Sequence, residues 1–190
     1  MKVRGAVLLV SFGGPERAED VVPFLDRVLR GRNVPAARRD QVAEHYFRMG
    51  GRSPLNAANR AIIAALEREL DRRGLRLPVY FGNRNWHPLL EDTLRTMAAD
   101  GVGHALALVT SAFGSYSSCR QYMDDMARAR AAVGRAAPRL EKIRLFFNHP
   151  GFIAIQAERL RAALEHAGGS AELIFTAHGI PLEMAAAAPY

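Results

Sequence analysis

The residues best suited to chemistry lie near the end of the sequence, where Leu173–Pro181 reads LIFTAHGIP. The apolar residues predict a buried strand over 172–177, and Gly179 and Pro181 predict a turn after it. A side chain at the carboxyl end of a parallel strand points into the crevice where open α/β sheets bind ligands. Imidazole, with an ordinary pKa of about 6.5, can accept a proton or hold a metal ion near neutral pH. His178 is therefore the leading candidate for a catalytic and metal-binding residue.

Three further segments follow predicted strands and would meet His178 at the same edge of a sheet. They are Ser11–Pro15, Gly82–Trp86 and Ser111–Tyr116. Together they offer aromatic and small side chains. The first of them lacks the G-x-G-x-x-G spacing of a dinucleotide-binding loop, and no other phosphate-binding loop is present. The set predicts a site for a flat apolar ligand with polar edges.

The elements that must position these residues alternate between strand and helix. Helical patterns run from Ser53-Pro54, an N-cap followed by a first-turn proline, to Gly74, and from Pro88 to Gly101. Two more run from near Ser117 to Gly134 and from Pro150 to Gly168. Strand patterns cover residues 5–11, 78–82, 104–111, 142–146 and 172–177. The alternation predicts an α/β fold, a doubly wound parallel sheet of Rossmann type, with a helical insertion at about 13–75 that covers the crevice.

Composition narrows the class of protein. The chain has 190 residues, 49% of them hydrophobic and 24% charged, which is one domain's worth of an ordinary globular protein. The net charge of +7 comes almost entirely from scattered arginines with no aromatic-flanked basic stripe, so no nucleic-acid partner is expected and an anionic small ligand is favoured. A single cysteine excludes an intrachain disulfide. With no signal peptide and no membrane-spanning run in the sequence, a cytoplasmic location is expected.

Several motifs occur together in one order and spacing. They are FGGPE at Phe12–Glu16, LRGR at Leu29–Arg32, GGRSPLN at Gly50–Asn56, GNRNW at Gly82–Trp86, SYSSCRQY at Ser115–Tyr122 and TAHGIP at Thr176–Pro181. This set of motifs resembles the ferrochelatase family, and the motif sequences are most similar to those of the actinobacterial type that inserts ferrous iron into coproporphyrin III. The resemblance covers essentially all 190 residues. It implies a chelatase-like fold and a lyase of haem biosynthesis, with porphyrin and Fe²⁺ as substrates and no required cofactor.

The resemblance also implies roles for individual residues. His178 matches the family's active-site histidine, a metal ligand or the base that accepts pyrrole protons. Ser53 and Tyr122 fall where coproporphyrin-type enzymes contact the porphyrin. Phe12 stands where some relatives have an iron-ligating tyrosine, so only ring packing is left to it. A propionate-binding arginine of some members falls at Leu29, and no substitute for it is assigned.

The resemblance also implies that part of the family's pattern is missing. Residues 1–190 correspond to the amino-terminal chelatase domain plus the catalytic histidine, and the second, similar domain with its acidic partner is absent. A second chain or domain is therefore expected to supply that acid. The [2Fe–2S] ligands of some actinobacterial relatives lie largely in the same part, so no cluster is expected, and Cys119 is predicted to be a small buried side chain.

Alternatives remain open at this stage. The chain could be a truncated or split enzyme, a short homodimeric cobalt-type chelatase, or a non-catalytic porphyrin-binding fragment. Tyr122 and Ser53 also suit plain core packing and helix capping. Arg84 and Trp86 could hold the fold rather than act in the site, and Asp124 and Asp125 are expected to be solvated helix surface.

Overall fold

The structure is a computed structural model that describes residues 4–114, 120–168, 171–176, 182 and 186. The chain divides into two compact units. Unit 1 takes in Met1–Thr110 and Met123–Ile143, and unit 2 takes in Ser111–Tyr122 and Arg144–Tyr190.

A four-stranded parallel sheet forms the centre of unit 1. Its strands are β1 (Arg4–Ser11), β2 (Val79–Asn83), β3 (Val102–Val109) and β4 (Arg139–Lys142), in the order β2-β1-β3-β4. From β1 the chain passes to β2, its neighbour on one side, and then crosses to β3, its neighbour on the other side. This reversal makes the carboxyl ends of β1 and β3 the switch point, where such sheets bind ligands. The predicted α/β class with a parallel sheet is confirmed.

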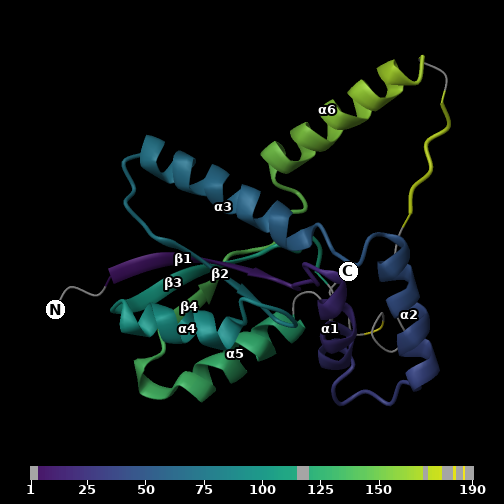
Figure 1. The fold of residues 1–190 in the computed structure, drawn as a ribbon. Coiled ribbons are helices and arrows are strands. Elements are labelled where there is room, and N and C mark those ends of the chain that lie inside the picture. The colour runs from purple at the N-terminus through teal and green to yellow at the C-terminus, as the bar shows by residue number, and fades with distance from the viewer. Residues whose placement is uncertain (1–3, 115–119, 169–170, 177–181, 183–185, 187–190) are drawn as a thin grey trace. The chain divides into compact units, whose positions relative to one another are not determined.

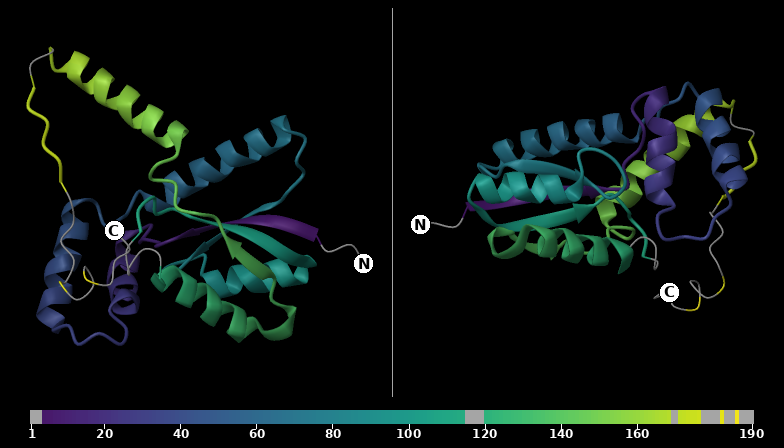
Figure 2. Two further views of the ribbon diagram at one scale, coloured as in Figure 1. Left: turned by 180° about the vertical axis from the view of Figure 1, so that it is seen from behind. Right: turned by 60° about the horizontal axis from the view of Figure 1, so that its bottom comes forward.

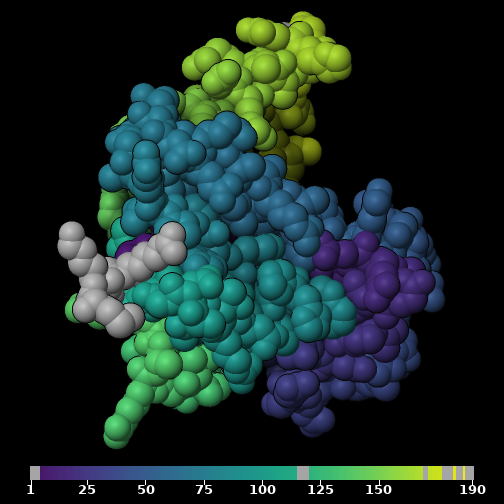
Figure 3. Space-filling model, turned by 60° about the vertical axis from the view of Figure 1, so that its left-hand side comes forward, coloured from purple at the N-terminus to yellow at the C-terminus, as the bar shows by residue number. Residues whose placement is uncertain are grey.

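Helices cover both faces of this sheet. In Figure 1, α3 (Leu55–Arg72) lies above it, and α4 (Leu90–Ala99) and α5 (Gln121–Val133) lie below. The same two layers are seen from behind in the left view of Figure 2. In the space-filling view the blue α3 lies above the teal and green of α4 and α5 (Figure 3). The sheet of unit 1 is therefore doubly wound.

Because helices cover both faces of the sheet, the central strand β1 is buried. Leu8, Leu9 and Val10 on β1 have no exposed surface. Neighbouring residues of a strand point to opposite faces, so three consecutive buried residues show that both faces of β1 are covered. At the edge of the sheet that the described residues form, β4 is short and carries Arg139 and Lys142, which suits an edge strand.

Three helical segments follow β1 before α3 begins. They are the short 3-10 turn η1 (Ala18–Asp20), α1 (Val21–Val28) and α2 (Ala36–Arg48). The last two lie beyond the carboxyl end of β1 (Figure 1). They pack through a small core of Val21, Phe24, Leu25 and Ala43. That residues 13–75 cover a ligand as an insertion, within one chelatase domain spanning 1–190, stays a prediction.

Several predicted boundaries are confirmed. The helix predicted to end at Gly74 ends at Arg72, with Gly74 in the left-handed region at φ 72°. There the Gly74 N–H donates to the Asp71 carbonyl and the Leu75 N–H to the Leu70 carbonyl, the pattern of a Schellman cap. The helix predicted from Pro88 is α4, and the one predicted from Pro150 is α6 (Pro150–His166).

The strand predicted at 142–146 is displaced. β4 occupies Arg139–Lys142 instead, since its register pairs Arg139 with His104 and Lys142 with Ala107, near the end of β3. Phe146, at the end of the predicted strand, and the next residue, Phe147, belong to an aromatic cluster of unit 2. In it Phe147 stacks on Phe113 at 6.2 Å, and Phe146 meets Phe152 of α6 edge-on at 5.4 Å.

The strand predicted at 172–177 is wrong for the part that the structure describes. Residues 171–176 have no regular secondary structure and are exposed. Ile174 is 83% exposed and Phe175 90%. The pattern for a strand is present, but a strand forms only when a neighbouring chain segment satisfies its backbone groups, and no described residue pairs with this segment. No helix in the described part of the chain has both the length and the apolar character that crossing a membrane requires.

Candidate functional site

The loop that follows β1 is the centre of the candidate site, and it is held by backbone hydrogen bonds. The N–H groups of Arg84 and Asn85, after β2, donate to the carbonyls of Ser11 and Phe12 at 3.0 and 3.1 Å. The Ser53 N–H donates to the Pro15 carbonyl at 2.7 Å. Two of the four segments expected to converge, those after β1 and β2, therefore lie side by side, and Ser53 joins them.

Two glycines allow this close packing. Gly13 has φ 83°, and a Cβ there would lie 2.9 Å from the Trp86 backbone nitrogen. At Gly14 a Cβ would lie 2.6 Å from the Ser53 Cβ and 2.8 Å from its Oγ. Only glycine fits at these two positions without displacing the neighbouring segment.

A buried pair of asparagines fixes α3 to the end of β2. Asn56 and Asn83 have no exposed surface, and the Asn83 Nδ2 donates to the Asn56 Oδ1 at 3.0 Å. Both side chains also donate to the His87 carbonyl, at 3.0 and 3.1 Å. Sequence reasoning placed both residues in motifs but assigned them no role. The signal for Asn56 was a polar residue at the start of a helix that packs on a sheet, and the signal for Asn83 was a polar residue at the end of a strand.

Ser53 stands immediately before α3. Its Oγ accepts the Leu55 N–H at 3.2 Å, which satisfies one of the free N–H groups at the helix start. The helix predicted to have Ser53 as its N-cap and Pro54 as its first residue begins at Leu55 instead, with Pro54 in the N-cap position, so Ser53 lies one residue before that position. Its O–H can still donate to a ligand, because accepting one hydrogen bond leaves the hydroxyl hydrogen free to rotate.

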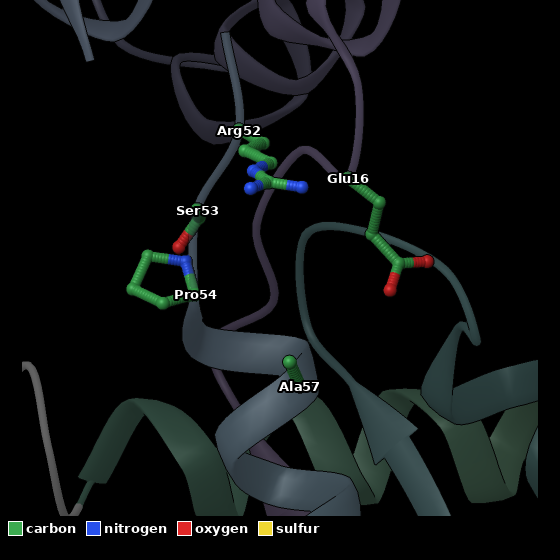
Figure 4. A pocket seen from close by; sticks show the side chains of 5 residues that line it. All are labelled: Glu16, Arg52, Ser53, Pro54 and Ala57. Carbon is green, nitrogen blue, oxygen red and sulfur yellow. The ribbon is translucent and has the colours of Figure 1, made fainter. Parts of the chain in front are cut away.

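A cavity of about 440 Å³ opens beside Ser53. Figure 4 shows the side chains that line it, namely Glu16, Arg52, Ser53, Pro54 and Ala57. The Arg52 guanidinium lies between the Ser53 and Glu16 sides of this cavity, while the Ser53 hydroxyl is directed toward Pro54 (Figure 4). The cavity is open to solvent, and its polar side is formed by Glu16, Arg52 and Ser53. Its lining thus carries one negative charge, on Glu16, and one positive charge, on Arg52.

Hydrogen bonds lower the pKa of two carboxylates, that of Glu16 in the cavity lining and that of its neighbour Asp20. A hydrogen bond from Arg60 holds the pKa of Glu16 below its ordinary 4.5, and the opposing effect of partial burial is smaller. For Asp20, burial is the largest single influence and raises the pKa. Hydrogen bonds from the Glu16 N–H, Arg17 and Trp86 together outweigh it, so the Asp20 pKa lies below its ordinary 3.8.

Phe12 lies at the tip of the same loop with 37% of its surface exposed. Its ring meets Phe24 edge-on at 6.2 Å, and Phe24 in turn meets Tyr46 and Trp86 edge-on at 6.0 and 6.1 Å. The Arg84 guanidinium carbon lies 5.6 Å from the Phe12 ring centroid, within the range of a cation–π contact. Phe12 is therefore supported by an aromatic cluster and still presents ring surface to a ligand.

The expectation that Asp125 is solvated surface is wrong. The Arg84 Nε lies 2.5 Å from the Asp125 Oδ2, and the two side chains are only 8% and 10% exposed. Asp125 also pairs with the exposed Arg128 one turn on. The helical position suggested surface because the sequence alone does not show that α5 turns this face toward the loop after β2. Of the two roles left open for Arg84, the ion pair supports the fold-holding one.

Two of the expected site residues belong to the other unit. Tyr122, in the first turn of α5, is buried with 5% of its surface exposed. His178 lies outside the described residues, as do Cys119 and the predicted helix start at Ser117 and Ser118. The structure thus brings Phe12 and Ser53 together in unit 1, and the roles of all four predicted site residues stay predictions.

A metal site is not formed by the described residues alone. Within residues 4–114, 120–168, 171–176, 182 and 186, no three histidine, cysteine, aspartate or glutamate side chains come together. His149 takes part in a helix cap, because its Nδ1 accepts the Gly151 N–H at 3.1 Å at the start of α6.

The sequence matches known proteins over nearly its whole length. A family model described as ferrochelatase matches residues 4–190. The chain is 59% identical to the coproporphyrin III ferrochelatase of Nocardia farcinica over 187 residues, and 54% identical to that of Mycobacteroides abscessus over 177. A ferrochelatase of Rhodopirellula baltica is 54% identical over 181 residues. The three alignments cover 96%, 93% and 94% of this chain but 53%, 52% and 52% of the relatives, so the chain spans about half the length of the curated relatives it matches.

Proposed function

Because the chain belongs to the ferrochelatase family, we propose that it binds coproporphyrin III and takes part in the insertion of ferrous iron into it during haem biosynthesis. The observation that carries this proposal is the 59% identity, over 96% of the chain, to a protein named coproporphyrin III ferrochelatase. The same name, given to relatives from Nocardia and Mycobacteroides, favours coproporphyrin over protoporphyrin as the substrate. In this proposal iron is a substrate, and no resident cofactor takes part.

The reaction sets the chemical demands on the site. Two pyrrole nitrogens of the free porphyrin must lose their protons, and Fe²⁺ must lose bound water before the nitrogens can coordinate it. We assign His178 to this step. A neutral imidazole is a suitable acceptor for a pyrrole proton and a suitable ligand for the incoming ion near pH 7.

The porphyrin is assigned to the loops at the carboxyl end of β1. Phe12 would pack its exposed ring surface against the macrocycle, since aromatic rings stack favourably on flat π systems. Phenylalanine has no ligating atom, so iron coordination falls to other residues. Ser53 and Tyr122 would contact the polar edge of the ligand through their hydroxyl groups.

The proposal also includes a partner. The chain spans about half the length of its relatives, and no acidic residue in it is assigned to carry away the pyrrole protons. We propose that a further domain or a second chain supplies that carboxylate. A split or truncated enzyme is favoured over a short homodimeric chelatase because the alignments are to the longer, coproporphyrin-type proteins.

Two measurements test this function. The first is binding of coproporphyrin III to the 190-residue chain, followed by the change in the porphyrin absorption band. The second is anaerobic insertion of Fe²⁺, followed by loss of porphyrin fluorescence. It is measured with the chain alone and with the part of the Nocardia farcinica relative that the chain does not match. We expect binding by the chain alone and iron insertion in the complemented mixture.

His178→Ala is the decisive variant, and His166→Ala is its matched control, because His166 is an exposed histidine in the last turn of α6. We expect His178→Ala to lower iron insertion by at least about a hundredfold, the scale of a lost general acid–base catalyst. His166→Ala should leave the rate unchanged. A wild-type chain that fails to bind coproporphyrin would refute the proposed function, and full iron insertion by His178→Ala would refute the assignment of the histidine.

A further inference from the structure

The lining of the cavity beside Ser53 includes a positively charged side chain, Arg52, that takes part in no ion pair in the described part of the chain. Arg52 is exposed. We propose that Arg52 binds a carboxylate substituent of the porphyrin. This inference rests on the proposed function and names the residue that recognises the acidic edge of the substrate.

The charges around the cavity support an anionic ligand. Glu16, the acidic residue of the lining, is paired with Arg60, so its negative charge is already offset. The charge left over in the lining is the positive charge of Arg52. A guanidinium binds a carboxylate through two parallel hydrogen bonds, which makes arginine well suited to this group.

The position of Arg52 next to Ser53 sets where such a carboxylate would lie. Ser53 is tied by its N–H to Pro15 in the loop after β1, and Phe12 begins that loop. A macrocycle packed on Phe12 would therefore place its edge substituents toward the strip of chain that carries Arg52. Coproporphyrin has four carboxylate substituents and no other charged edge group, so a cation here distinguishes it from neutral porphyrins.

One arginine of the family's pattern is missing from this chain, and Arg52 offers a positive charge at another position. The family position that holds a propionate-binding arginine is Leu29 here, and its neighbours Arg30 and Arg32 are exposed after α1 and do not line this cavity. Arg52 lies instead in the GGRSPLN motif, which follows α2 in the sequence. The chain thus retains a cation for the substrate edge at a different position.

The test compares porphyrin affinities of three variants of the full chain. Arg52→Gln removes the charge, Arg52→Lys retains it without the planar fork, and Arg76→Gln removes an exposed charge beyond the far end of α3. α3 has 18 residues and is therefore about 27 Å long, so Arg76 is remote from the cavity. We expect Arg52→Gln to raise the Kd for coproporphyrin III about twofold to fivefold, the effect of one exposed ion pair. Arg52→Lys should have a smaller effect and Arg76→Gln none.

A second ligand separates this inference from the proposed function. Coproporphyrin III tetramethyl ester, in the same detergent buffer, keeps the macrocycle and lacks the charges, so wild type and Arg52→Gln should bind it equally. Equal binding of coproporphyrin III by wild type and Arg52→Gln would overturn the role of Arg52 and leave porphyrin binding intact. An equal loss for acid and ester would assign Arg52 to the fold and overturn the inference as well. If wild type binds neither porphyrin, the proposed function and this inference fail together.

Discussion

The ion pair between Arg84 and Asp125 gives the sharpest prediction of stability. Their side chains are 8% and 10% exposed, and their nearest charged atoms are 2.5 Å apart. Removing one partner of such a pair leaves a charge in a site with little water, at a cost of about 3–5 kcal/mol. We expect Asp125→Ala to lower the free energy of unfolding by that amount.

The two single substitutions should not be equal. After Arg84→Met, Asp125 still pairs with Arg128, which is 72% exposed and can follow the carboxylate toward water. This variant should therefore lose only about 2 kcal/mol. The double variant Arg84→Met/Asp125→Leu replaces the pair by apolar side chains of similar size. It should be more stable than Asp125→Ala, because no charge is left buried without a partner.

Urea unfolding followed by circular dichroism measures these differences. For a chain of this length 1 kcal/mol corresponds to about 2–4 °C in Tm, so Asp125→Ala should melt about 6–20 °C lower. The control is Arg95→Ala, since Arg95 pairs with Glu91 and Asp92 on α4 but is 52% exposed. We expect this control to change stability by less than about 0.5 kcal/mol. If Asp125→Ala costs no more than Arg95→Ala, then the pair is solvated and the reasoning is wrong.

Two further substitutions test the loop after β1. Gly14→Ala places a Cβ 2.6 Å from the Ser53 Cβ, so we expect a loss of about 1–3 kcal/mol and weaker coproporphyrin binding, whereas Gly5→Ala, whose Cβ would have its nearest contact at 3.5 Å, should be neutral. Equal stability of these two variants would contradict the close contact. Because the Asp20 pKa is lowered in the folded state, Asp20 adds stability at pH values above its ordinary 3.8, and this stability is lost as the pH falls through the folded value. The urea midpoint of wild type should therefore drop more between pH 5 and pH 3 than that of Asp20→Asn, and parallel curves would count against the role of Asp20.

The fold of unit 1 could be predicted from the sequence because its signals are local. The strand patterns at 5–11, 78–82 and 104–111 match β1, β2 and β3 within two residues, since a strand covered on both faces reads as a continuous apolar run. The end of α3 at Gly74 was equally local, because a helix cap depends on a few neighbouring residues.

The misplaced elements depend on partners that a local pattern does not show. Leu173–Phe175 has the composition of a buried strand and is exposed in the structure, because a strand also requires a paired neighbour. The position of β4 follows from its register on β3, which the strand pattern at 142–146 did not reveal.

The residues of the candidate site, too, could be predicted only in part from the sequence. The motifs identified Phe12 and Ser53, and the structure places both on one tightly bonded loop system. Asp125 was misjudged, and Asn56 and Asn83 were overlooked, because each acquires its role from a contact more than 20 residues away in the sequence. Long-range polar contacts of this kind follow from packing rather than from local composition.

Three of the bonds that hold the site loops are made by backbone groups alone, from Arg84 and Asn85 to Ser11 and Phe12 and from Ser53 to Pro15. Peptide N–H and carbonyl groups are the same whatever side chain is attached to them. Side chains that face the guest molecule in the proposed function, such as those at positions 12 and 52, can therefore be replaced without rebuilding the scaffold beneath. The preference for one tetrapyrrole over another then depends on single side chains carried by an unchanged frame.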